Sequence, residues 1–193
     1  MTTTAKKIHH AIADWVGDIV ALETHVEEAM DRQLKLESPD PAIATAIQRF
    51  HDAVRDSKQR AEAFQGQYGS EPGNPIIKAG SSLLGKAAGM IDNMREDGVA
   101  KSLRDDYTAY SLLAMSYTMI HTTAMALEDP ATQAFAEQGL RTYASLVQDV
   151  SYLMPEAVLA DLKDNPDHPL QNPNVAAESR RLIQHVWQST TND

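Results

Sequence analysis

Two histidines and one glutamate fall where the sequence pattern predicts the buried faces of helices. Glu23, His51 and His121 each continue an apolar row at steps of three and four residues, which places each on one face of a helix. A buried ionisable group is costly unless it is paired, hydrogen-bonded or bound to a metal. Two histidines and one carboxylate are also the facial ligand set of non-haem iron proteins. One hypothesis is therefore a mononuclear iron or manganese site made of these three residues.

Further polar residues are expected on the same inward faces, and they suggest a different core. Gln48, Tyr117 and Tyr143 have donors and acceptors that match those of the glutamate and the histidines. Because buried polar groups are normally satisfied by one another, we expect a metal-free hydrogen-bond network and no cofactor. The iron or manganese site stays open as the alternative. The metal-free interpretation predicts a non-catalytic structural or binding protein, which we expect to form a homodimer.

Long helices must position these residues, since helix signals dominate the sequence and strand alternation is nearly absent. The expected long helices span 5–36, 41–64, 100–128 and 130–152, and a shorter helix spans 75–95. The pairs Asp40-Pro41, Asn74-Pro75 and Asp129-Pro130 combine an N-cap residue with a proline in the first helical turn. Four long helices with one long middle connection have the connectivity of ferritin-like folds.

We therefore predict an all-α, ferritin-like four-helix bundle with a helical crossover and a C-terminal helical appendage. The bundle is expected to occupy residues 1–154 and the appendage residues 155–193. In the appendage, a short helix over 155–164 precedes a proline-rich linker and a last helix over 175–188 that contains Trp187. This last helix should dock on the bundle or on a second subunit.

Several segments resemble the YciF-type ferritin-like stress proteins in their order and spacing. Residues 18–30 (DIVALETHVEEAM) are similar to the first helix of that family, which carries a metal-site glutamate at the position of Glu23. Phe50-His51, Gly89-Met90-Ile91 and Arg104-Asp105-Asp106 resemble its later segments. The resemblance covers residues 8–154 and implies a stress-associated role. Inward carboxylates of the family correspond here to Gln48, Tyr117 and the pair Thr142/Tyr143, so the resemblance implies a degenerate metal site.

Composition excludes several other classes of function. A formal net charge of −10 argues against nucleic-acid binding, which depends on clustered Lys and Arg. The absence of cysteine excludes disulfides and thiolate chemistry. Residues 107–127 carry no Asp, Glu, Lys or Arg, but seven of them are Ser, Thr or His, which is too polar for a lipid-facing helix. The N-terminal residues lack the apolar core of a signal peptide, so we expect a cytoplasmic protein that does not bind membranes.

Overall fold

Four long helices and one shorter helix make up the part of the chain that the structure describes. The computed structural model describes residues 3–35, 40–70, 98–163, 170, 172 and 174–189. The long helices are α1 (Thr3–Gln33), α2 (Pro41–Ser70), α4 (Val99–Ala126) and α5 (Pro130–Lys163), and the shorter one is α6 (Val175–Ser189). The expected crossover helix over 75–95 lies outside the described residues.

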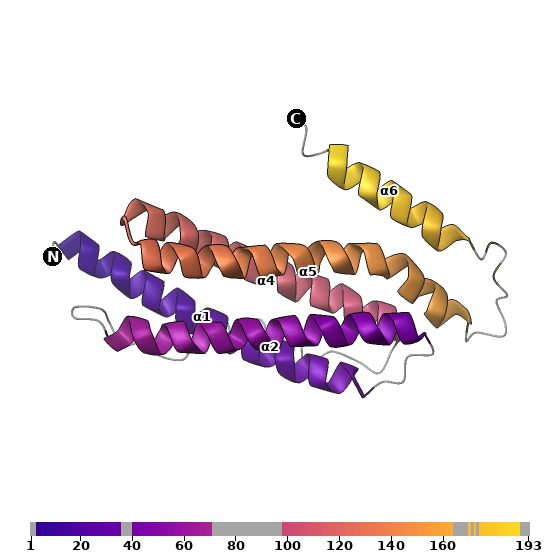
Figure 1. Cartoon of the computed structure of the whole chain (residues 1–193), viewed down its shortest axis with the longest axis horizontal. Helices are drawn as coiled ribbons and strands as arrows, with labels where there is room; N and C mark the ends of the chain where they lie inside the picture. Colours follow the sequence, from indigo (N-terminus) through magenta and orange to yellow (C-terminus); the bar gives the residue numbers. More distant parts are fainter. Residues whose placement is uncertain are drawn as a thin grey trace.

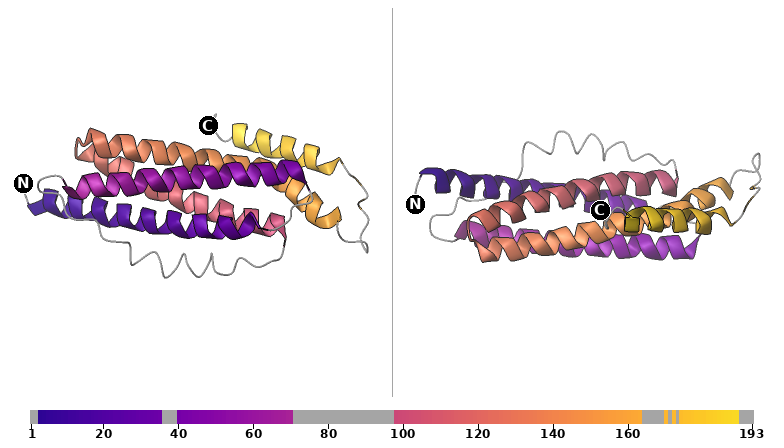
Figure 2. Two further views of the ribbon diagram at one scale, coloured as in Figure 1. Left: turned by 60° about the horizontal axis from the view of Figure 1, so that its bottom comes forward. Right: turned by 90° about the horizontal axis from the view of Figure 1, so that it is seen from above.

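The long helices form a bundle in which α1 pairs with α2 and α4 pairs with α5, as Figure 1 shows. Further contacts join α1 to α4 and α2 to α5, so the four helices surround one core. The views in Figure 2 show α6 on the outside of the bundle, where it packs against α5. The all-α bundle predicted from the sequence is confirmed.

Buried residues on each helix recur at helical spacing and meet in the centre of the bundle. On α2 these residues include Ile43, Ile47, Phe50, Val54, Ser57 and Ala61. Steps of three and four place all of them on one stripe. The largest fully buried side chains of the bundle include three tyrosines, Tyr110, Tyr117 and Tyr143. The core therefore contains polar hydroxyl groups that need partners.

The predicted caps at the starts of two helices are confirmed. Oδ1 of Asp40 accepts a hydrogen bond from the backbone N of Ala42 at 2.9 Å, and Oδ1 of Asp129 accepts one from the backbone N of Thr132 at 3.0 Å. Each carboxylate satisfies an N–H group that has no partner within its helix.

Two helices continue beyond their predicted ends because tertiary contacts support the extra turns. Helix α2 was expected to end at Phe64 but reaches Ser70, and Tyr68 in the added turns is only 3% exposed. Helix α5 was expected to end at Tyr152 but continues through Pro155 to Lys163. Pro155 has no backbone N–H to donate within the helix. Near this point, Nε of Arg180 in α6 donates to the backbone carbonyl of Tyr152 at 3.2 Å.

Within the described residues, none of the helices combines the length and the apolar character that crossing a bilayer requires.

Candidate functional site

A single buried carboxyl group connects all four long helices at the centre of the bundle. Glu23 of α1 is 0% exposed. Its Oε1 accepts hydrogen bonds from the hydroxyls of Ser57 of α2 at 2.8 Å, Tyr117 of α4 at 2.9 Å and Tyr143 of α5 at 2.9 Å. Each of the other three long helices therefore donates one hydroxyl to the same oxygen. We call Glu23, Ser57, Tyr117 and Tyr143 the carboxyl–hydroxyl cluster.

Burial changes the acid–base properties of this cluster. It raises the pKa of Glu23 from 4.5 to about 7, although the hydrogen bonds from Ser57, Tyr143 and Tyr117 and the charge of Arg60 act in the opposite direction. Burial, followed by the charge of Glu23, also raises the pKa values of both tyrosines well above 10. The tyrosines are therefore neutral donors, and Glu23 is the group that gains or loses a proton near neutral pH.

The second carboxyl oxygen of Glu23 is in a different situation. Oε2 is buried and has no hydrogen-bond partner among the described residues. An unpaired buried oxygen is costly when it shares a negative charge. The proton of the neutral acid can occupy Oε2 while Oε1 keeps its three hydroxyl donors, so the cluster is compatible with both protonation states of Glu23.

A glycine on α5 makes room for one of the tyrosines. A Cβ atom placed on Gly139 would lie 2.2 Å from Cε1 of Tyr117 and 2.3 Å from its Cζ. The ring of Tyr117 therefore packs directly on the backbone of α5. Only a residue without a side chain leaves the space that this tyrosine needs to reach Glu23.

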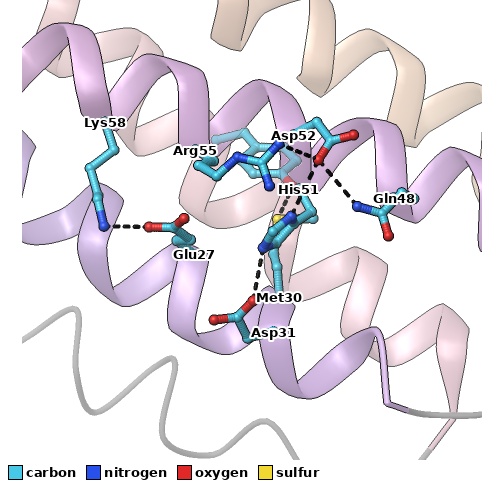
Figure 3. Close-up of polar contacts among 9 residues, drawn as sticks. Glu27, Met30, Asp31, Gln48, His51, Asp52, Arg55 and Lys58 are labelled. Atoms are coloured by element: carbon cyan, nitrogen blue, oxygen red, sulfur yellow. Dashed lines mark hydrogen bonds and ion pairs between the residues drawn. The ribbon is translucent and has the colours of Figure 1, made fainter.

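The predicted residue His51 is buried but belongs to a different set of contacts, which Figure 3 shows. Its Nε2 lies 2.9 Å from Oδ1 of Asp31, and its Nδ1 lies 3.7 Å from Oδ1 of Asp52. Its ring is 8% exposed, whereas the side chains of Asp31 and Asp52 are 58% and 44% exposed. His51 thus sits at the edge of the α1–α2 seam and turns toward surface carboxylates, not toward Glu23.

Two further predicted residues also lie away from Glu23. Gln48 is exposed, and its Nε2 donates to Oδ1 of Asp52 at 3.1 Å. The prediction that it belongs to a buried network was wrong, because it follows buried Ile47 and one helical step turns it off the inward stripe. His121 is half-buried. It lies near Glu137 of α5. The pKa of the Glu137 carboxyl is lowered mainly by Arg141, and His121 makes a smaller contribution in the same direction.

The structure therefore brings Tyr117 and Tyr143 to Glu23 but directs the two histidines elsewhere. Within residues 3–35, 40–70, 98–163 and 174–189, no three His, Asp or Glu side chains are arranged to hold a metal ion. The standard dimetal centre of ferritin-like bundles takes carboxylates from all four helices. Here α4 and α5 contribute the phenols of Tyr117 and Tyr143 in place of carboxylates. Their hydrogen bonds occupy one oxygen of Glu23. The residues present do not fit that dimetal centre.

Ser57 and Asp106 are buried polar residues that the sequence-based prediction missed. Ser57 lies three residues after Val54. Extending the predicted inward row of His51 and Val54 by one further step therefore identifies Ser57. Asp106 of α4 is 1% exposed, and burial raises its pKa from 3.8 to about 7. The nearby amide of Gln33 works against this increase. No hydrogen bond of normal geometry joins the two among the described residues. Asp106 lies on the inward stripe with Tyr110 and Leu113, a signal that the sequence did contain.

Comparison with known proteins identifies the family. Residues 7–163 match the family described as a domain of unknown function, DUF892. The chain belongs to this family. The match ends where α5 ends, so α6 lies outside it. Among curated proteins, none matches the chain.

Two solved structures share the fold of this DUF892 protein. One is the protein XCC3681 of Xanthomonas campestris pv. campestris, with a TM-score of 0.65 and 15% sequence identity over 81% of this chain and 97% of that chain. The other is the E. coli stress protein YciF, with a TM-score of 0.61 and 13% identity over 86% of this chain and 100% of that chain. The resemblance to YciF-type proteins and the ferritin-like fold are thus confirmed.

Proposed function

We propose that this DUF892 protein is a stress-associated, metal-free member of its family with a non-catalytic structural or binding role. The observation that carries the proposal is the carboxyl–hydroxyl cluster. Three hydroxyls from three helices converge on Oε1 of Glu23. Glu23 is the carboxylate that a metal centre at this position would need. The cluster satisfies buried polar groups with one another and so serves the packing of the bundle.

Charge balance supports this proposal. Two divalent cations at the centre of the bundle would face one carboxylate and two tyrosines whose pKa values are well above 10. Hard cations in such sites are normally neutralised by several carboxylates. Arg60 adds a positive charge that already lowers the pKa of Glu23. The surroundings of Glu23 therefore favour hydrogen-bond donors over cations.

Metal analysis tests the proposal and its mononuclear alternative together. Protein expressed in medium supplemented with iron and manganese is expected to contain far less than one metal ion per chain. The Glu23→Ala variant should contain the same amount, because no metal depends on Glu23. Elemental analysis of both proteins is the measurement. Stoichiometric iron or manganese that disappears in Glu23→Ala would contradict the proposal and favour a site of Glu23, His51 and His121.

The surface around α6 is the region that we propose for self-association with a second copy of the chain. Leu182 and Val186 of α6 are 64% and 50% exposed. They border an open cavity of about 490 Å³ between α6 and the bundle, whose other lining residues include Trp187 of α6 and Tyr107 of α4. Neighbouring exposed apolar side chains commonly mark an interaction surface. A homodimer that uses this surface repeats the same contacts on both subunits.

The dimer prediction is tested by placing a charge on this surface. Leu182→Asp is expected to convert a dimer into a monomer, because an unpaired carboxylate is costly in an apolar interface. Gln184→Asp adds the same charge at an exposed position outside the cavity lining and should leave the dimer intact. Sedimentation velocity gives the mass of each variant. A wild-type protein that is monomeric at all concentrations, or a Leu182→Asp protein that remains dimeric, would contradict the prediction.

A further inference from the structure

Aromatic side chains form a continuous series through the core, from the N-terminal part of α1 to the carboxyl–hydroxyl cluster and beyond it. Each ring contacts the next, with centroid separations between 4.0 and 6.3 Å. The closest pair, Phe64 and Phe135, is stacked at 4.0 Å with an interplanar angle of 4°. In order, the series consists of His9, Tyr68, Phe64, Phe135, Tyr117, Tyr143 and Tyr110.

The phenols of this series differ in whether a base can take their proton. The hydroxyl of Tyr68 donates to the backbone carbonyl of His9 at 3.2 Å and lies 2.9 Å from Nδ1 of the same residue. Both Tyr117 and Tyr143 donate to Oε1 of Glu23 at 2.9 Å. These distances are within the range that permits direct proton transfer. Tyr110 instead donates to Sδ of Met30 at 3.1 Å, and a thioether is only a weak acceptor.

This difference determines where an oxidised tyrosine is stable in the core. Removing one electron from a phenol without removing its proton would leave a positive charge in the apolar interior, which is costly. At Tyr117 and Tyr143 the proton can move to the carboxylate form of Glu23, so that the phenol becomes a neutral radical. The two rings lie 5.8 Å apart at an interplanar angle of 19° and share one proton acceptor. The electron vacancy can therefore be exchanged between them.

We propose that the aromatic series carries a one-electron oxidising equivalent from the surface near Tyr68 to the Tyr117–Tyr143 pair, where it is held as a neutral tyrosyl radical. The oxidant is a one-electron radical oxidant in solution. It accepts one electron, which leaves Tyr117 or Tyr143 through Phe135, Phe64 and Tyr68. The phenol O–H bond breaks, and its proton forms a new O–H bond at Glu23.

The return step restores the starting state. A one-electron reductant of the enediol class, such as ascorbate, supplies the electron through the same series, and Glu23 returns the proton to the phenoxyl oxygen. Half-buried His9 places the outer end of the series near solvent, whereas Tyr117 and Tyr143 are 1% and 0% exposed. Burial keeps the radical away from other radicals in solution. The activity goes beyond the proposed structural role and requires no metal.

Photochemical oxidation followed by electron paramagnetic resonance tests this activity in the full-length protein. Photo-oxidised tris(bipyridine)ruthenium serves as the one-electron oxidant, and ring-deuterated tyrosine identifies a tyrosyl signal by its narrowed lines. The wild-type protein is expected to give a persistent tyrosyl radical. The double variant Tyr117→Phe/Tyr143→Phe should lose this persistent signal. Tyr152→Phe, a change at a half-buried tyrosine outside the series, should retain it.

A second variant keeps every phenol in place, because the double variant loses two hydrogen bonds and can be unstable. Glu23→Gln retains an oxygen acceptor but provides no carboxylate to take the proton, so the signal should be weaker and should decay faster. Circular dichroism confirms that each variant is folded. A radical in Glu23→Gln with the yield and lifetime of the wild type would overturn the proposal, as would the same result in the folded double variant or a wild-type protein without a persistent tyrosyl signal.

Discussion

Replacement of Gly139 by alanine is expected to lower the free energy of unfolding by about 3 kcal/mol or more. The new Cβ would lie 2.2 to 2.4 Å from three ring atoms of Tyr117, a separation that no packed structure tolerates. Tyr117 is 1% exposed and donates to Glu23, so moving its ring breaks a buried hydrogen bond and disturbs the core. The gain in helix propensity from glycine to alanine, about 1 kcal/mol, is too small to compensate. Urea unfolding followed by circular dichroism measures the effect.

The chain contains a matched control for this substitution. Gly66 is also inside a helix, but among the described residues a Cβ at this position meets no atom within 4 Å apart from the nearby backbone of its own helix. Gly66→Ala should therefore leave stability unchanged or raise it by up to about 1 kcal/mol. In a Tyr117→Leu background, Gly139→Ala should lower the free energy of unfolding by less, because the ring that clashes with the new Cβ is absent. Equal effects of the two glycine substitutions would show that Tyr117 does not pack on α5 as described.

Titration of Glu23 and Asp106 is expected to lower the stability of the protein as pH rises from about 4.5 to about 7. Burial raises the pKa of Glu23 from 4.5 and that of Asp106 from 3.8, each to about 7. In this pH range the folded protein binds more protons than the unfolded chain, so the free energy of unfolding falls with pH. The stabilising contribution of Glu23 and Asp106 is complete below the pKa values that these groups have in the unfolded chain. It is lost once pH exceeds about 7. Its size is on the order of 3 kcal/mol for each group.

Glu23→Gln separates this effect from the titration of the remaining carboxylates. The variant stays neutral at every pH, so its stability relative to the wild type should increase between about pH 5 and about pH 8 by on the order of 3 kcal/mol. Asp106→Asn should behave in the same way. Glu62→Gln removes an exposed carboxylate from α2 and should give a difference that changes little with pH. A constant difference between Glu23→Gln and wild type across this range would mean that Glu23 is already charged in the folded protein at low pH.

Much of the fold follows from local patterns in the sequence. The caps at Asp40 and Asp129 form as predicted, because a cap depends on residues within one helical turn. The apolar rows predicted that Glu23, His51, Tyr117 and Tyr143 are buried, since helical spacing alone determines which residues share a face. The ends of α2 and α5 were not predicted, because Tyr68 and Arg180 stabilise them through contacts with distant segments.

The sequence by itself determined that an acidic side chain and several phenols lie within a helical bundle. Only the tertiary structure decided which of them meet, because the depth and rotation of each helix depend on packing against its neighbours. One helical step separates Phe50 from His51, and that step directs the ring of His51 toward Asp31 and not toward Glu23. Ser57 occupies the position on α2 that faces Glu23. The centre of the bundle is therefore a carboxyl group surrounded by hydroxyls, an arrangement that depends on how the four helices are aligned.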